Sequence, residues 1–151
     1  MNSKGSTPYY NRFKGLNWFN RISNSQIIIF GQGGIGSHLS FFLSRAGANL
    51  IVVDFDKVEE HNLAGQLYGK DDVGKSKTSA IADVLTRLCG NVNLIALDEQ
   101  VKSKGGDWRS LIADQDVVCV SFDNIAARKL VYEEWKKTGK GGSLFVDGRI
   151  S

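Results

Sequence analysis

The sequence predicts an α/β fold of the Rossmann type, doubly wound, with a mainly parallel sheet and helices on both faces. Short apolar runs alternate along the chain with segments of helical periodicity, which is the pattern of strands joined by crossover helices. The first apolar run ends in a cluster of glycines, and the next ends in an aspartate. A length of 151 residues with 42% hydrophobic residues and one proline fits a single folded domain.

The glycine cluster predicts a turn that approaches a phosphate. Gly31 and Gly33 follow the expected strand at 26–30 and allow a tight turn, while Gly36 allows the next helix to pack closely on that strand. The N-terminus of the helix then offers free N–H groups to an anion. Asp54 ends the following apolar run, where its carboxylate can accept hydrogen bonds from ribose hydroxyls. Together these features predict a mononucleotide-binding half.

The remaining elements follow from periodicity and breakers. Residues 1–25 are interpreted as an N-terminal lead and a short helical segment, and residues 26–151 as the nucleotide-binding domain. The expected strands are 26–30, 50–54, 92–97, 116–121 and 143–147, and the expected helices are 37–45, 75–88, 107–113 and 124–137. The chain stops directly after the fifth strand, so a fold truncated at that point is expected.

Two segments carry further expectations. The helix at 37–45 contains Leu39, Phe41, Phe42 and Leu43, an apolar face wide enough to be buried against a sheet. The connection at 56–72 lacks apolar periodicity, and long ordered connections in compact domains tend to be functional.

Composition argues against several classes of protein. A net charge of +3 with scattered basic residues gives no indication of nucleic-acid or membrane binding. No apolar run is long enough to cross a bilayer and no signal core begins the chain, so a cytoplasmic location is expected. Cys89 and Cys119 lack metal-ligand spacing and are interpreted as packing residues, so these residues give no support for a zinc site.

Residues 69–76 match the phosphate-loop pattern literally, but we reject that interpretation. No apolar strand leads into the segment, and Asp71 and Asp72 would face the phosphates with the wrong charge.

An ordered series of motifs surrounds the predicted nucleotide turn. After Asp54 and Asp56 come Asn62 and Gln66, then 73–77 with Lys77, and then 121–124 after the fourth strand. With the glycine turn, this series resembles the ThiF/MoeB/HesA family, the adenylating domain shared with ubiquitin-activating enzymes. The resemblance runs from Tyr10 to about Val146.

The resemblance implies an ATP- and Mg²⁺-dependent enzyme that adenylates the carboxyl-terminal carboxylate of a ubiquitin-like or sulfur-carrier protein. It also implies a homodimer in which Arg12 reaches the nucleotide of the partner subunit. Asp123 is the implied magnesium ligand, and Arg12, Lys77 and Asp123 are the implied catalytic residues. The implied nucleotide-binding residues are Gly31, Gly33, Gly34, Gly36, Asp54, Asp56, Asn62, Gln66 and Lys77.

The chemistry of adenylation suits these residue types. A carboxylate attacking the α-phosphorus of ATP brings anions together, so positioning and charge neutralisation are required and a histidine is not. His38 and His61 are therefore interpreted as structural or solvent-facing. The chain has Gly65 where many family members have an arginine, which removes one cation that would face the phosphates.

Two other functions also suit parts of this sequence pattern. The glycine turn and Asp54 would also suit an NAD-dependent oxidoreductase, and Gly65 leaves open a nucleotide-binding module without catalysis. Taken singly, Asp54 could cap a strand end, Asp123 could cap the helix that follows it, and Lys77 could be an ordinary first-turn lysine.

Overall fold

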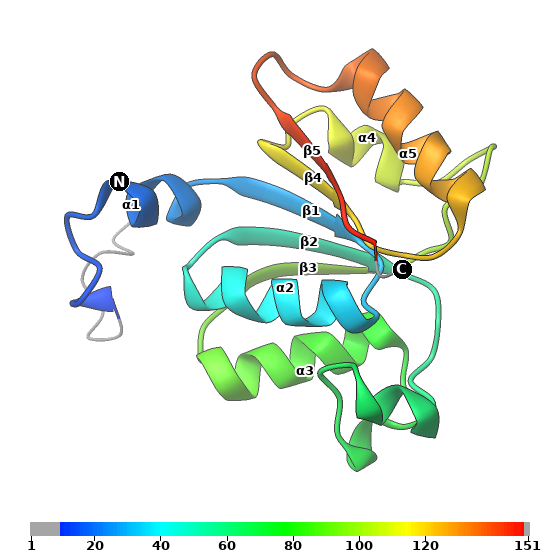
Figure 1. Cartoon of the computed structure of the whole chain (residues 1–151), viewed down its shortest axis with the longest axis horizontal. Coiled ribbons are helices and arrows are strands. Elements are labelled where there is room, and N and C mark those ends of the chain that lie inside the picture. The colour runs from blue at the N-terminus through cyan, green and yellow to red at the C-terminus, as the bar shows by residue number, and fades with distance from the viewer. Residues whose placement is uncertain (1–9, 150–151) are drawn as a thin grey trace.

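The computed structural model describes residues 10–149 and contains one five-stranded parallel sheet with helices on both faces, which confirms the predicted fold class (Figure 1). The strand order is β3-β2-β1-β4-β5. The chain thus builds outward from β1 on one side and then crosses to β4 on the other, so β1 and β4 flank a topological switch point. The strands are β1 (Gln26–Phe30), β2 (Asn49–Asp54), β3 (Asn93–Asp98), β4 (Val117–Val120) and β5 (Leu144–Asp147).

The helices form two layers (Figure 1). One face of the sheet is covered by α2 and α3, the other by α4 and α5, and the short α1 lies at the amino ends of the strands. Two 3-10 turns, η3 and η4, lie in the connection between β2 and α3. Their bounds are α1 Asn17–Ser23, α2 Gly34–Arg45, η3 Glu60–Ala64, η4 Lys70–Asp72, α3 Lys77–Cys89, α4 Trp108–Ile112 and α5 Ile125–Thr138.

The central strand β1 is buried on both faces. Ile28 and Phe30 pack with the α4 and α5 side, where Trp108 is fully buried. Ile27 and Ile29 pack on the opposite side beside α2. A strand buried on both faces has an almost continuous apolar run, which is why the sequence indicates β1 so clearly.

All four expected helices begin at other residues than predicted: α4 and α5 begin one residue later, and α2 and α3 differ by more. Helix α2 begins at Gly34 rather than residue 37, because Gly33 already occupies the N-cap. Helix α3 begins at Lys77 rather than residue 75, because Ser76 is the N-cap and its Oγ accepts a hydrogen bond from Ser79 N at 3.3 Å.

The predicted apolar face of α2 was partly wrong. The helix buries Ser37, Ser40 and Ser44, while Phe42 is 65% exposed. The serine hydroxyls are accommodated because Ser37 Oγ donates to Gly33 O at 2.7 Å and Ser40 Oγ donates to the Gln32 side chain at 2.9 Å. Leu39, Phe41 and Leu43 of the predicted face do pack against the buried clusters, so of the four predicted residues only Phe42 faces solvent.

The connection between β2 and α3 is ordered. Val58 and Tyr68 from this segment are buried against Ile81 and Leu85 of α3. Where the phosphate-loop pattern occurs, η4 stands in place of a strand-to-helix turn, and Gly69 N donates to the Asp72 carboxylate at 2.9 Å. A segment whose own carboxylate occupies its backbone donor is not a phosphate loop, which confirms the rejection. Among residues 10–149, no helix has the length and apolar character that crossing a membrane requires.

Candidate functional site

The glycine turn joins β1 to α2 under tight steric constraint. Gly31 has φ +90°, and a Cβ added there would lie 2.8 Å from Phe122 N. A Cβ at Gly36 would lie 1.8 Å from Gly31 O. Helix α2 begins without a side-chain cap, so the N–H groups of its first turn face the space above the turn. That space is suited to an anion.

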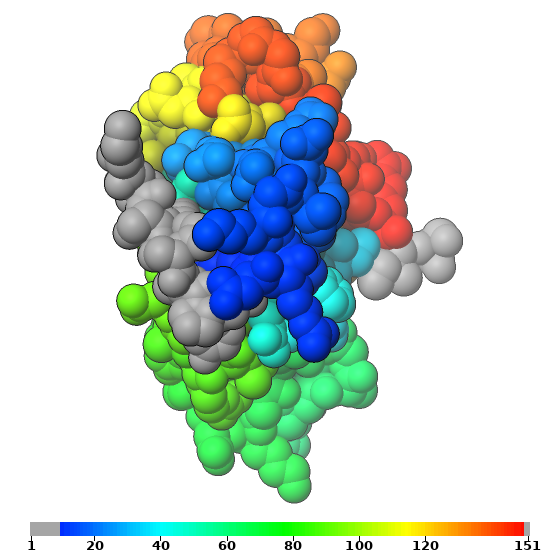
Figure 2. Space-filling view, turned by 90° about the vertical axis from the view of Figure 1, so that its left-hand side faces the viewer, coloured from blue at the N-terminus to red at the C-terminus, as the bar shows by residue number. Residues whose placement is uncertain are grey.

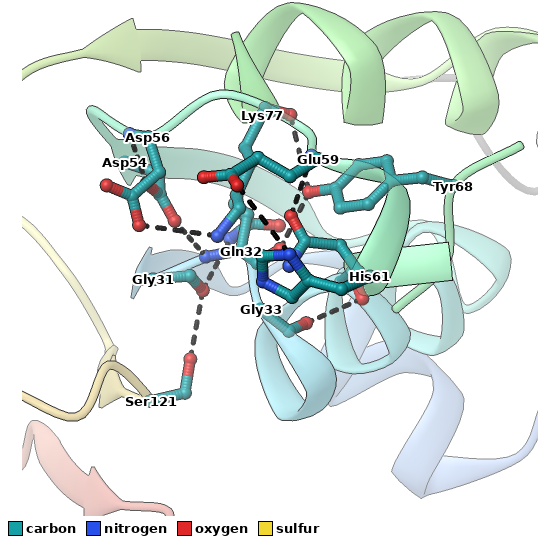
Figure 3. Close-up of polar contacts among 12 residues, drawn as sticks. Gly31, Gln32, Gly33, Asp54, Asp56, Glu59, His61, Tyr68, Lys77 and Ser121 are labelled. Carbon is teal, nitrogen blue, oxygen red and sulfur yellow. Dashed lines mark hydrogen bonds and ion pairs between the residues drawn. The ribbon is translucent and has the colours of Figure 1, made fainter. Parts of the chain in front are cut away.

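The buried residue Gln32 holds this turn in place through hydrogen bonds (Figure 3). Gln32 is fully buried; its side-chain Nε2 donates to Gly31 O at 3.1 Å, and its backbone carbonyl accepts the Tyr68 hydroxyl at 2.6 Å. Burial is the largest cause of the raised pKa of Tyr68, so this hydroxyl stays a donor. Sequence reasoning missed both residues, since their roles depend on a contact between segments far apart in the chain.

Asp54, at the carboxyl end of β2, lies beside the turn. Its Oδ2 accepts Gln32 N at 2.6 Å and its Oδ1 accepts Asp56 N at 2.8 Å, so it does cap the strand end. Each carboxylate oxygen keeps a second lone pair for a further donor. The side chain is buried, and this burial raises the pKa of Asp54 against the lowering effect of the two backbone N–H bonds and of Lys77.

Lys77 is the first residue of α3, and its Nζ lies 3.3 Å from Asp56 Oδ2. Only 9% of the lysine side chain is exposed, against 51% for that of Asp56. A cation at a helix N-terminus opposes the helix dipole, and the ion pair with Asp56 offsets this. Lys77 is therefore more than an ordinary solvated lysine, because its ammonium group forms part of a cleft wall.

Asn62 and Gln66, the two polar candidates in the connection between β2 and α3, have different surroundings in the structure. Asn62 is buried, its Oδ1 accepts Glu59 N at 2.9 Å, and its carbonyl accepts Gln66 N at 3.0 Å. Gln66 faces the glycine turn: its Nε2 lies 3.9 Å from where a Cβ of Gly33 would stand, and its buried Oε1 has no hydrogen-bond partner among the described residues. Gln66 thus lines the cleft, whereas Asn62 does not line it and instead holds the backbone of Glu59 and Gln66.

Asp123 follows β4, and its exposed carboxylate makes no hydrogen bond or ion pair with any residue from 10 to 149. The N-cap of α5 is Asn124, whose Oδ1 accepts Ala127 N at 3.0 Å. The interpretation of Asp123 as a helix cap was therefore wrong. Ser121 Oγ donates to Gly31 O at 2.9 Å and so connects this segment to the glycine turn.

Two adjoining clefts open where the parallel strands end. The larger, which we call the glycine-turn cleft, has a volume of about 340 Å³, and the smaller, the β3-side cleft, about 250 Å³. Both are lined by Asp54, Asp56, Phe122 and Asp123. The glycine-turn cleft adds Gly31, Gly33, Gly34, Ile35, Gln66, Lys77, Ser121, Arg128 and Gly148, and the β3-side cleft adds Val53, Phe55, Glu99, Gln100, Val101, Asn124 and Ala127.

Arg12 lies elsewhere. It is exposed and belongs to the segment that leads into α1, which lies near the amino ends of the strands (Figure 1) and whose blue atoms lie on the face shown in Figure 2. It lines neither cleft. Cys89 is also remote and lines a separate pocket with Tyr10 and Arg45, while Cys119 is buried in β4, where burial raises the pKa of its thiol to about 11.

The histidines take no part in either cleft. His38 Nδ1 lies 2.8 Å from Gly34 O within α2, and His61 is exposed beside Glu59. Across residues 10–149, no group of three or more His, Cys, Asp or Glu side chains is placed to hold a metal ion.

Comparison with known proteins gives a consistent result. The model of the ThiF family matches residues 10–145. The molybdopterin-synthase adenylyltransferase of Escherichia coli is 33% identical over 109 residues, which cover 71% of this chain and 43% of that protein. The probable adenylyltransferase/sulfurtransferase MoeZ of Mycobacterium tuberculosis is 30% identical over 143 residues, or 91% of this chain and 36% of MoeZ.

Two solved structures are also similar to this chain. The crystal structure of E. coli MccB with ATP has a TM-score of 0.67 and 26% identity, covering 79% of this chain and 36% of that one. The structure of PaaA has a TM-score of 0.72 and 25% identity, covering 86% and 42%. The chain thus spans about a third of the length of the first curated relatives that it matches.

Proposed function

The chain belongs to the ThiF family, and from this premise we propose that it binds ATP in the glycine-turn cleft and adenylates the carboxyl-terminal carboxylate of a ubiquitin-like or sulfur-carrier protein. The relatives named above are adenylyltransferases, and MccB binds ATP in a related structure. The observation that carries the proposal is the meeting, at one cleft, of a helix N-terminus, a buried lysine and an unpaired carboxylate.

Each group has a place in nucleotide binding. The first-turn N–H groups of α2, the Gln66 amide and the Lys77 ammonium surround the part of the cleft suited to phosphates. Asp54 accepts hydrogen bonds from the ribose hydroxyls with its remaining lone pairs. The β3-side cleft continues beyond Asp54 and accommodates the base.

The residues fit a magnesium ion held mostly by phosphates. Mg²⁺ is usually bound by one or two carboxylates together with substrate phosphates and water. Asp123 supplies one such carboxylate, unpaired and facing both clefts. Magnesium would neutralise phosphate charge and orient the leaving pyrophosphate.

In the proposed reaction, a carboxylate oxygen of the acceptor attacks the α-phosphorus as the bond from that phosphorus to the bridging oxygen of pyrophosphate breaks. The products are an acyl adenylate and pyrophosphate. No proton transfer is required, so the protein's contribution is alignment and charge neutralisation. Lys77 and the α2 N-terminus provide that neutralisation without a general base.

Calorimetric titration with Mg-ATP and with NAD tests the nucleotide. We expect Mg-ATP to bind more tightly, because Gln66, Lys77 and Asp123 all face the phosphate region. Lys77→Met should weaken Mg-ATP binding about tenfold or more, since a charge-assisted hydrogen bond is lost. Lys75→Met is the matched control, because Lys75 pairs with Asp72 and Asp83 and lines neither cleft.

Isotope exchange between pyrophosphate and ATP, in the presence of carrier proteins that end in glycine, tests the reaction. Exchange with at least one carrier is expected. Tighter binding of NAD would contradict the proposal, and Mg-ATP binding without exchange across the panel of carriers would support the non-catalytic alternative.

A further inference from the structure

Arg128 is a buried arginine that the proposed reaction has not yet used. It lies on α5, and its guanidinium group reaches back toward the N-terminus of that helix. It forms an ion pair with the Asp147 carboxylate, and it donates through Nε to Phe122 O and through Nη2 to Gly148 O, the latter at 3.0 Å. One side chain thus joins the segment after β4 to the segment after β5.

The segment held by Arg128 carries Asp123. On one side of Asp123, Ser121 Oγ is bonded to the glycine turn, and Phe122 O is bonded to Arg128. On the other side, Asn124 caps α5. The Asp123 side chain itself has no partner among the described residues, so its direction depends on this backbone.

The planar guanidinium of arginine can direct several N–H groups at fixed angles, whereas a lysine presents one point charge on a flexible stem. Replacing Arg128 by lysine would keep the charge opposite Asp147 but lose the simultaneous bonds to Phe122 O and Gly148 O. Phe122 would then be held by its ring contact with Phe30, at 6.4 Å between centroids, and by chain connectivity.

We propose that Arg128 is a positioning residue for adenylation, which holds the backbone at Phe122 so that the Asp123 carboxylate faces the metal ion of the bound nucleotide. This inference rests on the proposed function. It predicts that Arg128 acts through Asp123, without itself contacting the reacting atoms.

Hydrogen exchange of the backbone amides at 121–124, with nucleotide absent, is the first test. Arg128→Lys should speed exchange there while the melting temperature stays close to that of the unsubstituted chain. The matched control is Arg109→Lys. Arg109 is likewise bonded to a carboxylate, that of Glu134, and to the carbonyls of Lys102 and Ser103, but it lines neither cleft.

The magnesium requirement is the second test. In Arg128→Lys, the Mg²⁺ concentration for half-maximal ATP binding should rise about tenfold or more, as is typical when a group that orients a metal ligand is removed. ATP binding at saturating Mg²⁺ should recover. The control Arg109→Lys should leave both the exchange at 121–124 and the magnesium requirement unchanged.

The outcomes are distinguishable. Failure of the unsubstituted chain to bind Mg-ATP would contradict the proposed function, whereas normal binding with an unchanged magnesium requirement in Arg128→Lys would overturn this inference alone. Unchanged exchange at 121–124 in a folded Arg128→Lys would also overturn it. If Arg128→Lys does not fold, Asp147→Asn is the second variant: it removes the carboxylate charge that faces both Arg128 and Arg149 but leaves the Arg128 bonds to Phe122 O and Gly148 O in place. It should show both effects at smaller size, and the absence of both would overturn the inference.

Discussion

Adjacent residues after β4 divide two tasks that the sequence could not separate. Asn124 caps α5 through its side-chain oxygen, whereas the Asp123 carboxylate lines the cleft and is not paired with any other residue of the described range 10–149. Because Asp and Asn are almost equally good N-caps, either residue of the pair suits the capping role by type alone. The structure makes the two roles testable by crossed substitutions.

We predict that Asp123→Asn leaves the melting temperature unchanged but lowers pyrophosphate exchange by orders of magnitude, since one lost charge interaction in the transition state is worth about 3 to 4 kcal/mol. Asn124→Ala should do the reverse and cost about 1 kcal/mol of unfolding free energy, with exchange retained well below the melting temperature. A folded Asp123→Asn protein with normal exchange would remove Asp123 from the site.

Gly65 offers a gain-of-function test. Its φ is −137°, and a Cβ added there would meet nothing within 4 Å, so a side chain can begin at this position without a steric clash at Cβ. We predict that Gly65→Arg tightens Mg-ATP binding about tenfold, because it adds a cation next to Gln66 at the phosphate side of the cleft. Gly65→Ala controls for the backbone effect and should leave affinity unchanged. Equal affinities in the two variants would show that the added arginine does not reach the phosphates.

Asp54 predicts a pH effect on sugar recognition. Burial raises its pKa, so as pH falls this carboxylate takes up a proton before an ordinary aspartate does. The ionised form accepts stronger hydrogen bonds from hydroxyls than the protonated form. We predict that ATP binds more tightly than 2′-deoxy-ATP at neutral pH and that the ratio of the two affinities declines on acidification. Phosphate titration is common to both nucleotides and cancels in the ratio; a ratio independent of pH would argue that Asp54 does not bind the ribose.

At the scale of elements, the packing of α2 on β1 depends on a glycine at position 36. A Cβ at Gly36 would collide with Gly31 O, so α2 would have to move away from β1. We predict that Gly36→Ala lowers the free energy of unfolding by about 1 to 3 kcal/mol, measured by denaturant titration. Gly141→Ala, with no atom within 4 Å of the added Cβ, should have little effect. Equal stabilities would mean that the turn is less tightly packed than the structure indicates.

The order and type of the elements could be predicted, because each strand is an apolar run and each helix has its own periodicity. The burial of three serines on the inner face of α2 could not be predicted. Ser37 Oγ donates to Gly33 O and Ser40 Oγ to the Gln32 side chain, while Ser44 Oγ has no hydrogen-bond partner within residues 10–149. A hydrophobicity pattern registers such positions as exposed. The inner face of α2 therefore combines these serines with Leu39, Phe41 and Leu43, and only the apolar part could be predicted from hydrophobicity.

At the scale of the whole molecule, the segment that carries Arg12 leads into α1 near the amino ends of the strands (Figure 1). The two clefts are instead lined by residues at and after the carboxyl ends of the strands, and Arg12 is not among them. If Arg12 acts on a nucleotide, that nucleotide belongs to another subunit. We predict that mixing Arg12→Ala with Asp123→Asn protein restores part of the exchange activity, because a mixed dimer has one site with both residues intact. Mixed dimers that form but show no recovery would exclude action of Arg12 across an interface.

For the candidate site, as for α2, local sequence patterns indicate some residues but not the contacts between segments far apart in the chain. Asp54, Lys77, Gln66 and Asp123 could be chosen as candidates because each lies in the ordered series of motifs, and all four line the glycine-turn cleft. The supporting contacts could not be predicted. Tyr68 reaches Gln32 across 36 positions and Arg128 reaches Asp147 across 19, and no local pattern indicates either contact.

The ion pair between Lys77 and Asp56 has a consequence for how binding responds to salt. Before nucleotide enters, the lysine charge is already compensated by a neighbouring carboxylate. In the proposed complex, the nucleotide phosphate would replace Asp56 as the ion-pair partner of Lys77. Such a replacement would leave the number of ion pairs at Lys77 unchanged, whereas a free cation would gain one. The affinity contributed by Lys77 should accordingly depend only weakly on ionic strength.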